Sequence, residues 1–348
     1  MKAVVKYDQG PDKVEIRDVP APRVVPGSVM IEVKFCGVCG WDIEMWRHTM
    51  ANPVSVPVIQ GHEFCGTIAE VGPGVAAWKV GARVASETSA VVCGRCRCCR
   101  EGQYQLCPSR KGFGYGVDGA FTRYVVVRQE ILHRLPAEVS FEEGALCEPF
   151  CVVHHALAGG PRLKPGETAL VIGPGPMGLI SLQMARHLGA ERVILVCRDT
   201  SAARAAVAEK NGWADAVVNA SRPEASQQIL DLTGGEGAGV VVDAAGNSAA
   251  LRMALDAVGR MGRIVKIGWG PEPVGISLDP LLRKSVTLTG TFGHNRPDWE
   301  AVLGLMAQRR IHPRPLISGV LPLSRWREAF ERTKRSEAVK MLLYPEAE

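Results

Sequence analysis

Four cysteines lie within one short stretch at spacings that suit a metal ion. Cys93, Cys96, Cys99 and Cys107 follow the pattern C-x2-C-x2-C-x7-C, with Cys98 as a fifth thiol beside them. In a reducing compartment, clustered thiols are more often metal ligands than disulfides. Four thiolates complete a tetrahedral zinc shell and leave no position for a substrate. The spacing therefore predicts a structural zinc ion, with Cys98 pointing away from it.

A glycine-rich loop stands between an apolar run at 169–172 and a helix-period run at 177–188. A strand that ends in G-x-G-x-x-G and opens a helix presents backbone N–H groups at the positive end of that helix. A pyrophosphate can lie there, because glycines allow the backbone to approach closely. The loop therefore predicts a dinucleotide site formed by Gly173, Gly175, Pro176, Met177 and Gly178.

The next strand bears on the choice between NAD and NADP. Cys197 stands nineteen residues after Gly178, where an NAD-binding strand usually ends in an acid, and Arg198 and Asp199 follow it. A carboxylate at this place bonds the ribose 2′-hydroxyl, whereas an arginine accommodates a 2′-phosphate. Cys197 followed by Arg198 favours NADP, while Asp199 in the acidic position would serve NAD.

The glycine loop belongs to a regular alternation of strand-like and helix-like runs that starts at Gly166. Six strands with intervening crossovers predict a doubly wound parallel sheet of α/β class. The strand-like runs are 168–172, 192–196, 216–218, 240–243, 263–267 and 286–289.

The chain before this region reads as short strands broken by Gly and Pro, followed by a helix-like run at 141–158. After residue 290 come a helix-like run at 297–308 and a strand-like tail at 338–344. We therefore predict two domains. Residues 1–152 and 291–348 form a β-rich domain that carries the cysteine lobe at about 90–110, and residues 153–290 form the dinucleotide-binding domain. The strand-like runs of the first domain are 1–7, 13–19, 28–35, 63–71 and 120–127.

The composition excludes several classes of protein. The 348 residues are 46% hydrophobic and 22% charged, with a formal net charge of +5, and basic residues are interspersed with acidic ones. This balance predicts no nucleic-acid partner. No apolar run reaches the roughly 18 residues that span a bilayer, and Met1–Tyr7 is typical of a strand rather than a signal peptide. We expect a cytoplasmic protein without a membrane partner.

Cys39, His62, Glu63 and Glu148 are separated in the sequence, and spacing alone does not join them. Their motifs nevertheless resemble, in the same order, those of zinc-containing medium-chain dehydrogenases, and the resemblance covers essentially the whole chain. It implies a GroES-like β-rich catalytic domain beside a Rossmann domain. The motifs are Phe35–Asp42, Gly61-His62-Glu63 with Gly66, the cysteine lobe, Cys147-Glu148-Pro149-Phe150 and Gly173–Gly178. The Glu-Pro-Phe element, with His155 seven residues after Glu148, is similar to the polyol (sorbitol) and threonine dehydrogenase branch.

The resemblance also implies a catalytic centre. Cys39 and His62 would bind a catalytic zinc, with Glu63 or Glu148 supplying the carboxylate directly or through a water. Such a mixed set leaves one position for an alcohol oxygen, and the activated alcohol would release hydride to NAD(P). The expected protein is a homo-oligomer, a dimer or tetramer, with two zinc ions per chain. Its expected substrate is a secondary alcohol of a polyol, a sugar or an amino alcohol.

Trp41 departs from the family pattern, which usually has Ser or Thr just after the Cys-Gly of the ligand turn. Its indole cannot replace the hydroxyl of a proton relay, because it only donates. The proton must leave through water, Glu44 or a second carboxylate, and Trp41 is a candidate wall of the substrate pocket. The candidate pocket residues, each of which could equally be core or surface, are Trp41, Trp46, Phe113, Phe292 and His294.

Two other functions stay open alongside alcohol oxidation. One is a carbonyl or ketose reductase in the physiological direction, which the sequence cannot separate from a dehydrogenase. The other is a catalytically silent sensor that keeps the fold, for which the missing relay hydroxyl is the best argument. A decayed enzyme would be expected to lose zinc ligands, and this chain keeps every candidate. A zinc-free quinone reductase would lack the cysteine lobe.

Overall fold

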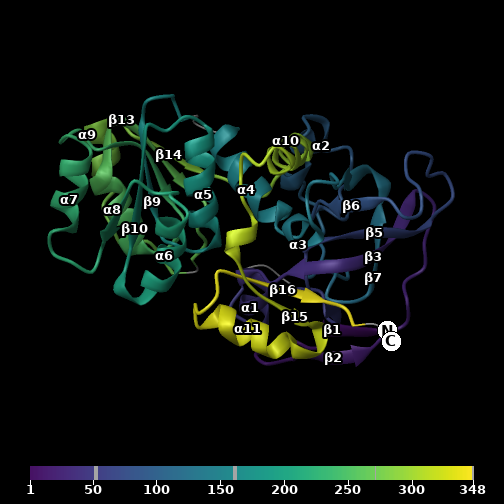
Figure 1. Cartoon of the computed structure of the whole chain (residues 1–348). Coiled ribbons are helices and arrows are strands. Elements are labelled where there is room, and N and C mark those ends of the chain that lie inside the picture. Colours follow the sequence, from purple (N-terminus) through teal and green to yellow (C-terminus); the bar gives the residue numbers. More distant parts are fainter. Residues whose placement is uncertain (51–53, 160–162, 271, 347–348) are drawn as a thin grey trace. The chain divides into compact units, whose positions relative to one another are not determined.

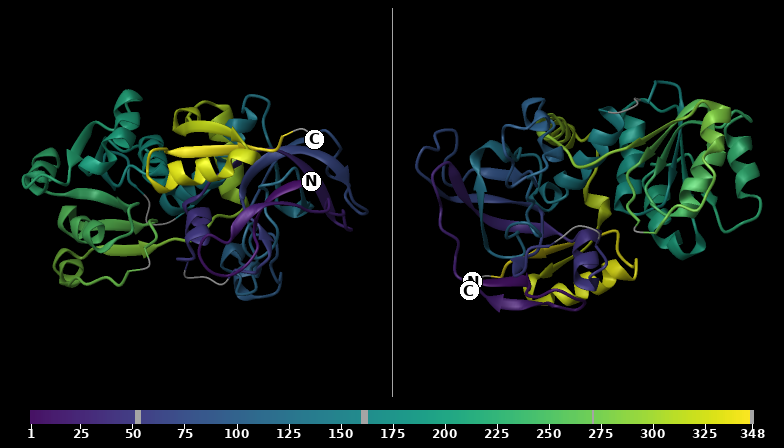
Figure 2. Two further views of the ribbon diagram at one scale, coloured as in Figure 1. Left: turned by 90° about the horizontal axis from the view of Figure 1, so that it is seen from below. Right: turned by 180° about the vertical axis from the view of Figure 1, so that it is seen from behind.

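The computed structural model describes residues 1–50, 54–159, 163–270 and 272–346, and the chain forms two units (Figures 1 and 2). The first unit comprises Met1–Cys151, Gly293–Arg309 and Ile317–Glu348. The second comprises Val152–Phe292 and Arg310–Leu316. Within the return segment expected at 291–348, residues 310–316 therefore group with the second unit.

The first unit is built on a seven-stranded mixed sheet and a small three-stranded sheet. The large sheet has the path β15-β16-β3-β5-β6-β8, with β7 paired to β3, and the small sheet has the order β2-β1-β4. The C-terminal strand β16 pairs antiparallel with β3, so the end of the chain returns to its N-terminal part. The strands are β1 (Lys2–Lys6), β2 (Val14–Asp18), β3 (Ser28–Gly37), β4 (Val58–Ile59), β5 (Glu63–Val71), β6 (Arg83–Ser86), β7 (Tyr124–Arg128), β8 (Leu132–Arg134), β15 (Ile317–Pro322) and β16 (Lys340–Tyr344).

Helices of the first unit carry several of the candidate residues, among them Trp41 and Glu148. The helix α4 (Cys147–Ala158) begins in the first unit and continues into the second. The others of the first unit are α1 (Gly40–Arg47), α2 (Arg97–Arg100), α3 (Phe141–Gly144), α10 (Arg296–Ala307) and α11 (Trp326–Lys334), with 3-10 turns at Tyr104–Leu106, Gln129–Ile131 and Leu323–Arg325.

The second unit is a six-stranded sheet with helices on both faces (Figure 1). Its order, β11-β10-β9-β12-β13-β14, reverses direction at β9, and every pair is parallel. This is the doubly wound order in which a ligand binds beyond the carboxyl ends of the central strands. Its elements are β9 (Thr168–Ile172), α5 (Pro176–His187), β10 (Arg192–Cys197), α6 (Ala202–Lys210), β11 (Ala216–Asn219), α7 (Ala225–Leu232), β12 (Ala238–Asp243), α8 (Ser248–Ala257), β13 (Val258–Lys266), α9 (Asp279–Lys284) and β14 (Thr287–Gly290), with 3-10 turns at Asp199–Ser201 and Arg314–Leu316.

Each unit has its own hydrophobic core. In the second unit, alternate residues of β9 and β10 pack against α7 and α8, as a period of two dictates. In the first unit, aromatic rings join the two sides of the core, and Trp46 makes edge contacts with Trp326 and Phe330. Burial of these apolar faces, at about 25 cal/mol per Å², is the main force that holds each sheet to its helices.

The structure corrects two local predictions. The single helix expected at 141–158 is two helices, because the chain leaves α3 at Gly144 and starts α4 at Cys147. The turn expected around Cys39 continues directly into helix α1. This helix was not predicted, because its apolar residues follow the helical period only weakly. The strand β15 and the helix α11 had no predicted counterpart.

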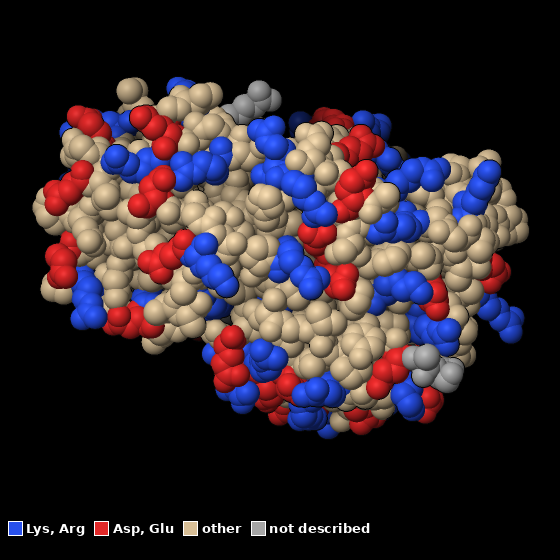
Figure 3. All heavy atoms as spheres, viewed as in Figure 1, with Lys and Arg blue, Asp and Glu red and all other residues tan. Residues whose placement is uncertain are grey.

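On the face shown in Figure 3, lysine and arginine side chains are interspersed with aspartate and glutamate over both units. Among the described helices, none combines the length and the apolar character needed to cross a membrane.

Candidate active site

Cys39, His62 and Glu63 meet at one edge of the large sheet. The strands β3 and β5 pair antiparallel with Gly37 opposite Glu63, so residues just after β3 lie beside residues just before β5. The Cys39 Sγ, a His62 ring nitrogen and a Glu63 carboxylate oxygen lie within 4.8 Å of one another. A thiolate, an imidazole and a carboxylate form a donor set that zinc prefers. The three residues fit a zinc ion by their chemistry and their proximity.

Helix α1 fixes the position of Cys39. Cys39 is the N-cap residue, with φ −95° and ψ 156°, and Asp42 Oδ2 accepts a hydrogen bond from its backbone N–H at 2.9 Å. Burial raises the pKa of Asp42 to about 6, although the nearby His62 opposes that shift. Asp42 was not among the predicted site residues; its signal in the sequence is an acid three residues after the cysteine, at the N3 position of a capping box.

The Cys39 thiol is partly buried beside a negative charge, and these surroundings disfavour its thiolate unless a cation is bound. Burial first, and then the charge of Glu63, raise the pKa of the thiol well above its usual range. A thiolate at such a place becomes favourable only when a positive charge compensates it. Among the described residues, Asp42 Oδ1 and His62 Nδ1 are buried without a hydrogen-bond partner. These features support a metal ion beside Cys39 and His62.

A buried lysine holds Glu63. Lys340 Nζ lies 2.6 Å from Oε1 and 2.5 Å from Oε2 of Glu63, and it also donates to the Val38 carbonyl oxygen at 3.1 Å. The two side chains are 3% and 1% exposed. Burial acts to lower the pKa of Lys340, but Glu63 outweighs it and the pKa is raised, so the lysine is charged. Gly37 leaves room for this pair, because a Cβ there would overlap Glu63 Oε2.

Glu148, in the first turn of α4, lies close to this site but is not within 4.8 Å of all three donors. Its Oε1 lies 3.1 Å from His294 Nε2. Burial acts to raise the pKa of Glu148, but the His294 hydrogen bond and the nearby His62 and Lys340 reverse this, and the pKa is lowered. Glu148 is therefore a carboxylate, and of the two carboxylates that the sequence offered, Glu63 lies within the donor cluster and Glu148 lies near it.

The four-cysteine lobe is a separate cluster. The sulfur atoms of Cys93, Cys96, Cys99 and Cys107 all lie within 4.8 Å of one another, and Cys98 is outside the group. Backbone N–H groups donate to three of the sulfurs: Cys96 N to Cys93, Cys99 N to Cys96, and Cys93 N to Cys107, at 3.3 to 3.4 Å. Such bonds stabilise thiolates, and the Arg95 and Cys96 backbone lower the pKa of Cys93 to about 6. The cluster fits a closed zinc site.

The glycine loop has the geometry of a phosphate cradle. Gly173 follows β9 with φ +102°, which an L side chain rarely adopts, and Gly175 is the N-cap of α5. Pro176 occupies the first turn of α5, and a Cβ on Gly178 would overlap the Gly173 carbonyl oxygen. Gly173 is thus required by a tight turn and Gly178 by a close approach, whereas a Cβ on Gly175 would meet nothing within 4 Å, so the space at the helix N-terminus stays open to an anion. Met177 lies between them, in the first turn of the same helix.

Cys197 is the last residue of β10, and Arg198 and Asp199 follow in the loop. The Asp199 carboxylate faces the end of the neighbouring strand, because its Oδ1 accepts a hydrogen bond from Asn219 Nδ2 at 2.6 Å. Arg222 lies 3.7 Å from the same oxygen. The Asp199 carboxylate is thus engaged with Asn219 and Arg222 of its own unit.

Of the candidate pocket residues, two belong to the hydrophobic core and three have other surroundings. Trp46 and Phe113 are each 2% exposed and belong to the hydrophobic core of the first unit, so their role is packing. Trp41 is half-buried and contacts Tyr115 edge-on, with ring centroids 5.9 Å apart. His294 is 1% exposed and bonds Glu148. Phe292 belongs to the second unit, where it contacts Trp269.

Comparison with known proteins assigns the chain to a family. Residues 25–137 match the alcohol dehydrogenase GroES-like domain, and residues 176–308 match the zinc-binding dehydrogenase domain. A sorbitol dehydrogenase of Halalkalibacterium halodurans is 35% identical over 346 residues, which cover 99% of both chains. A D-arabitol-phosphate dehydrogenase of Enterococcus avium is 35% identical over 344 residues, 99% of this chain and 97% of that one. The chain belongs to the zinc-binding medium-chain dehydrogenases, in their polyol dehydrogenase branch, as the motifs predicted.

Solved structures of the same fold include cofactor complexes. A zinc-binding dehydrogenase from Sinorhizobium meliloti 1021 bound to NADP has a TM-score of 0.89 and 28% identity, over 99% of both chains. An alcohol dehydrogenase from Escherichia coli CFT073 in complex with NADH has a TM-score of 0.89 and 26% identity, also over 99% of both. The predicted fold, a GroES-like domain with a Rossmann domain, is confirmed.

Proposed function

We propose that this chain is an NAD(P)-linked dehydrogenase that oxidises a secondary hydroxyl of a polyol, a polyol phosphate, a sugar or an amino alcohol at a zinc centre formed by Cys39 and His62. The observation that carries the proposal is the convergence of Cys39, His62 and Glu63 at one sheet edge, with Glu148 close by. Three protein donors leave a tetrahedral ion one position for a substrate oxygen. The sorbitol and arabitol-phosphate dehydrogenases among the relatives support this substrate class.

The residues of the site have separate roles in the proposed reaction. Zinc, when bound, supplies Lewis acidity toward the alcohol oxygen, and the nicotinamide accepts the hydride. Cys39 and His62 hold the ion, and Asp42 fixes the backbone of Cys39. Glu63 is the carboxylate that lies with Cys39 and His62, although it is ion-paired with Lys340, and Glu148, held by His294, is a second carboxylate that could approach the ion or a water on it. Trp41 offers no acceptor, and a second carboxylate or water takes the alcohol proton.

A substrate screen tests this function. Purified protein loaded with zinc should reduce NAD or NADP in the presence of at least one member of a panel of polyols, polyol phosphates, sugars and amino alcohols. The reverse reaction with the matching ketones would show whether the carbonyl reductase direction is faster. Protein that binds zinc and cofactor but oxidises no alcohol and reduces no ketone in the panel would instead support a silent sensor.

We propose NADP as the preferred cofactor, with Arg198 contacting its 2′-phosphate. Asp199 is engaged by Asn219 and Arg222, which supports this choice. Arg198→Ala should weaken NADP binding by about 1–3 kcal/mol, the loss expected for a charge-assisted hydrogen bond, and should leave NAD binding unchanged. Titration of both cofactors measures this. Asp199→Asn is the matched variant: a selective loss of NAD binding there, with wild type preferring NAD, would assign the choice to Asp199.

We propose Trp41 as a wall of the substrate pocket. The indole is half-buried against Tyr115 and the cluster of Met45, Val54 and Val58. Trp41→Ala should raise KM and relax the preference for substrate size, because a large aromatic face is lost. The measurement is kcat/KM over a series of alcohols of increasing length. An equal fall for every member of the series would make Trp41 a packing residue instead.

We further propose that the chain is a homo-oligomer, a dimer or tetramer. The strand β14 is an edge strand with mostly exposed residues, and Leu282 nearby is 81% exposed. An uncovered edge beside an apolar side chain is a surface that proteins usually cover. Sedimentation at micromolar concentration should give two or four chains per particle. A monomer would contradict the proposal.

A further inference from the structure

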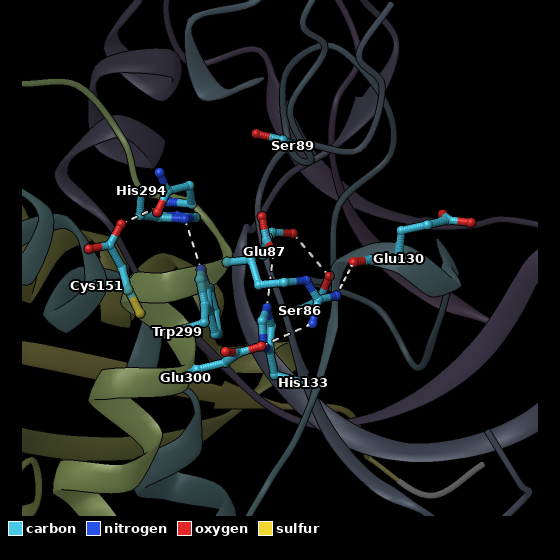
Figure 4. A network of polar contacts seen from close by, with 12 residues as sticks. Ser86, Glu87, Ser89, Glu130, His133, Cys151, His294, Trp299 and Glu300 are labelled. Carbon is cyan, nitrogen blue, oxygen red and sulfur yellow. Dashed lines mark hydrogen bonds and ion pairs between the residues drawn. The ribbon is translucent and has the colours of Figure 1, made fainter. Parts of the chain in front are cut away.

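His294 lies two residues before α10, next to its N-cap residue Asn295, and has a separate hydrogen-bond partner at each ring nitrogen (Figure 4). Its Nε2 lies 3.1 Å from Glu148 Oε1, and its Nδ1 lies 2.8 Å from Trp299 Nε1. The side chains of His294 and Trp299 are almost completely buried, at 1% and 0% exposure. None of the metal-ligand motifs in the sequence includes either residue.

The partner at Nδ1 fixes where the proton of His294 lies. An indole N–H can only donate a hydrogen bond, so the Nδ1 facing it must accept. The imidazole is then neutral with its proton on Nε2, and that N–H donates to Glu148 Oε1. Thr88 Oγ1, 3.4 Å from the same Nε2, is a weaker second neighbour whose hydroxyl accepts from Arg110 Nη2 at 2.9 Å.

The indole of Trp299 is itself held in place. Its ring stacks on His133, with centroids 5.3 Å apart and planes 12° apart. His133 Nε2 lies 3.0 Å from Oε1 of the buried Glu87 (Figure 4). Glu87 Oε2 in turn accepts a hydrogen bond from Tyr104 OH at 2.7 Å. Tyr104 OH also accepts from the backbone N–H of Arg296 at 2.6 Å, at the start of α10. Both the ring and the backbone of this segment are therefore fixed.

We propose that Trp299 and His294 are positioning residues for Glu148: Trp299 holds His294 in the Nε2–H tautomer, and this N–H holds one carboxylate oxygen of Glu148, leaving the other oxygen for the Cys39/His62 centre. This inference rests on the proposed function of Glu148. Hydrogen-bond partners of metal-site residues fix the orientation and tautomer of the groups they contact, and their loss commonly costs about 10–100-fold in activity or metal affinity.

The segment that carries His294 also contacts the cysteine lobe. Tyr104 lies three residues before Cys107, and Asn295 Nδ2 lies 3.5 Å from the Gly102 carbonyl oxygen. Residues 102–104 thus contact the segment that carries His294 twice: the Asn295 side chain contacts the Gly102 backbone, and the Tyr104 side chain contacts the Arg296 backbone. A closed metal site in the lobe would therefore help to keep His294 in register with Glu148.

Three variants test the hydrogen-bonded series Trp299–His294–Glu148 in the zinc-loaded, full-length enzyme. Trp299→Phe removes the N–H and keeps an aromatic ring on His133, His294→Gln keeps a donor near the Nε2 position, and His294→Phe removes it. Trp326→Phe is the matched control, because Trp326 is a buried tryptophan of the same unit that packs on Trp46 and Phe330. The readouts are kcat and KM, zinc content, and the 15N shifts of histidine-labelled protein, with the His294 signal assigned by its absence in His294→Phe.

We expect wild-type His294 to show the Nε2–H tautomer, and Trp299→Phe to lose it. His294→Phe should lower kcat about 10–100-fold with a smaller change in KM, and His294→Gln should recover at least part of that loss. Trp326→Phe should lower thermal stability without lowering kcat. A wild-type His294 protonated on Nδ1, or a kcat of Trp299→Phe equal to that of Trp326→Phe, would overturn the proposal. Inactive wild-type protein would instead overturn the proposed function, while the nitrogen shifts would still decide the tautomer.

Discussion

Cys39→Ser should abolish nearly all alcohol oxidation while the protein stays folded. Serine is a poor zinc ligand compared with a thiolate, so the variant should bind about one zinc ion fewer per chain than wild type. Lewis-acid stabilisation of the transition state is worth several kcal/mol, and each 1.4 kcal/mol is a factor of ten in rate. We therefore expect kcat to fall by about 10³-fold or more. Metal analysis, kcat and circular dichroism on the same preparation provide the measurement.

The four-cysteine lobe offers the matched control. Cys96→Ser should also remove about one zinc ion, because the two clusters use different residues. That ion would join the ends of a loop and contact no substrate, so its loss should lower stability or assembly more than kcat per folded molecule. The two variants together test the proposed count of two zinc ions per chain. Full turnover in Cys39→Ser, or zinc content unchanged in both variants, would contradict the assignment.

Local motifs allowed most of the dinucleotide-binding unit to be predicted. The glycine loop, the period of two in each strand and the intervening helical runs all concern neighbouring residues, and their alternation predicts a doubly wound parallel sheet, though not the order of its strands. The observed β10 and β14 lie within a residue or two of the predicted runs. The β13 strand begins at Val258, five residues before the predicted run, where no alternation marks its start.

The candidate site was harder to predict, because its residues are joined by the register of the large sheet. Cys39 and His62 could be named only through resemblance to a family, since nothing local shows that Gly37 pairs with Glu63. The cysteine lobe needed no such help, because all its sulfurs lie within one short loop.

Residues that support the ligands left almost no signal in the sequence. Lys340 reaches Glu63 from the last strand of the chain, and Trp299 reaches His294 from one turn into α10. A lysine in a strand and a tryptophan in a helix are ordinary residues until the fold places them beside a buried carboxylate or imidazole. Only Asp42 had a local signature, as the acid of a capping box.

The ion pair of Lys340 and Glu63 predicts the largest effect of a single substitution on stability. Both side chains are almost fully buried, so removing the ammonium group leaves a buried carboxylate without its cationic partner. Breaking a buried pair in this way costs about 3–5 kcal/mol. Lys340→Met should therefore lower the free energy of unfolding of the first unit by this amount. Five of the seven tryptophans belong to that unit, so denaturation followed by tryptophan fluorescence reports on it.

Two further variants separate the ion pair from other causes. Lys340→Met combined with Glu63→Gln should be more stable than Lys340→Met alone, because the uncompensated charge is gone. Glu337→Gln breaks the exposed pair with Arg335, whose side chains are 50% and 56% exposed, and should cost less than about 1 kcal/mol. All variants are compared at equal zinc content, since an ion bound only by the native state would add to stability. A Lys340→Met protein as stable as Glu337→Gln would show that Glu63 is compensated by another cation, for which the metal at Cys39 and His62 is the nearest candidate.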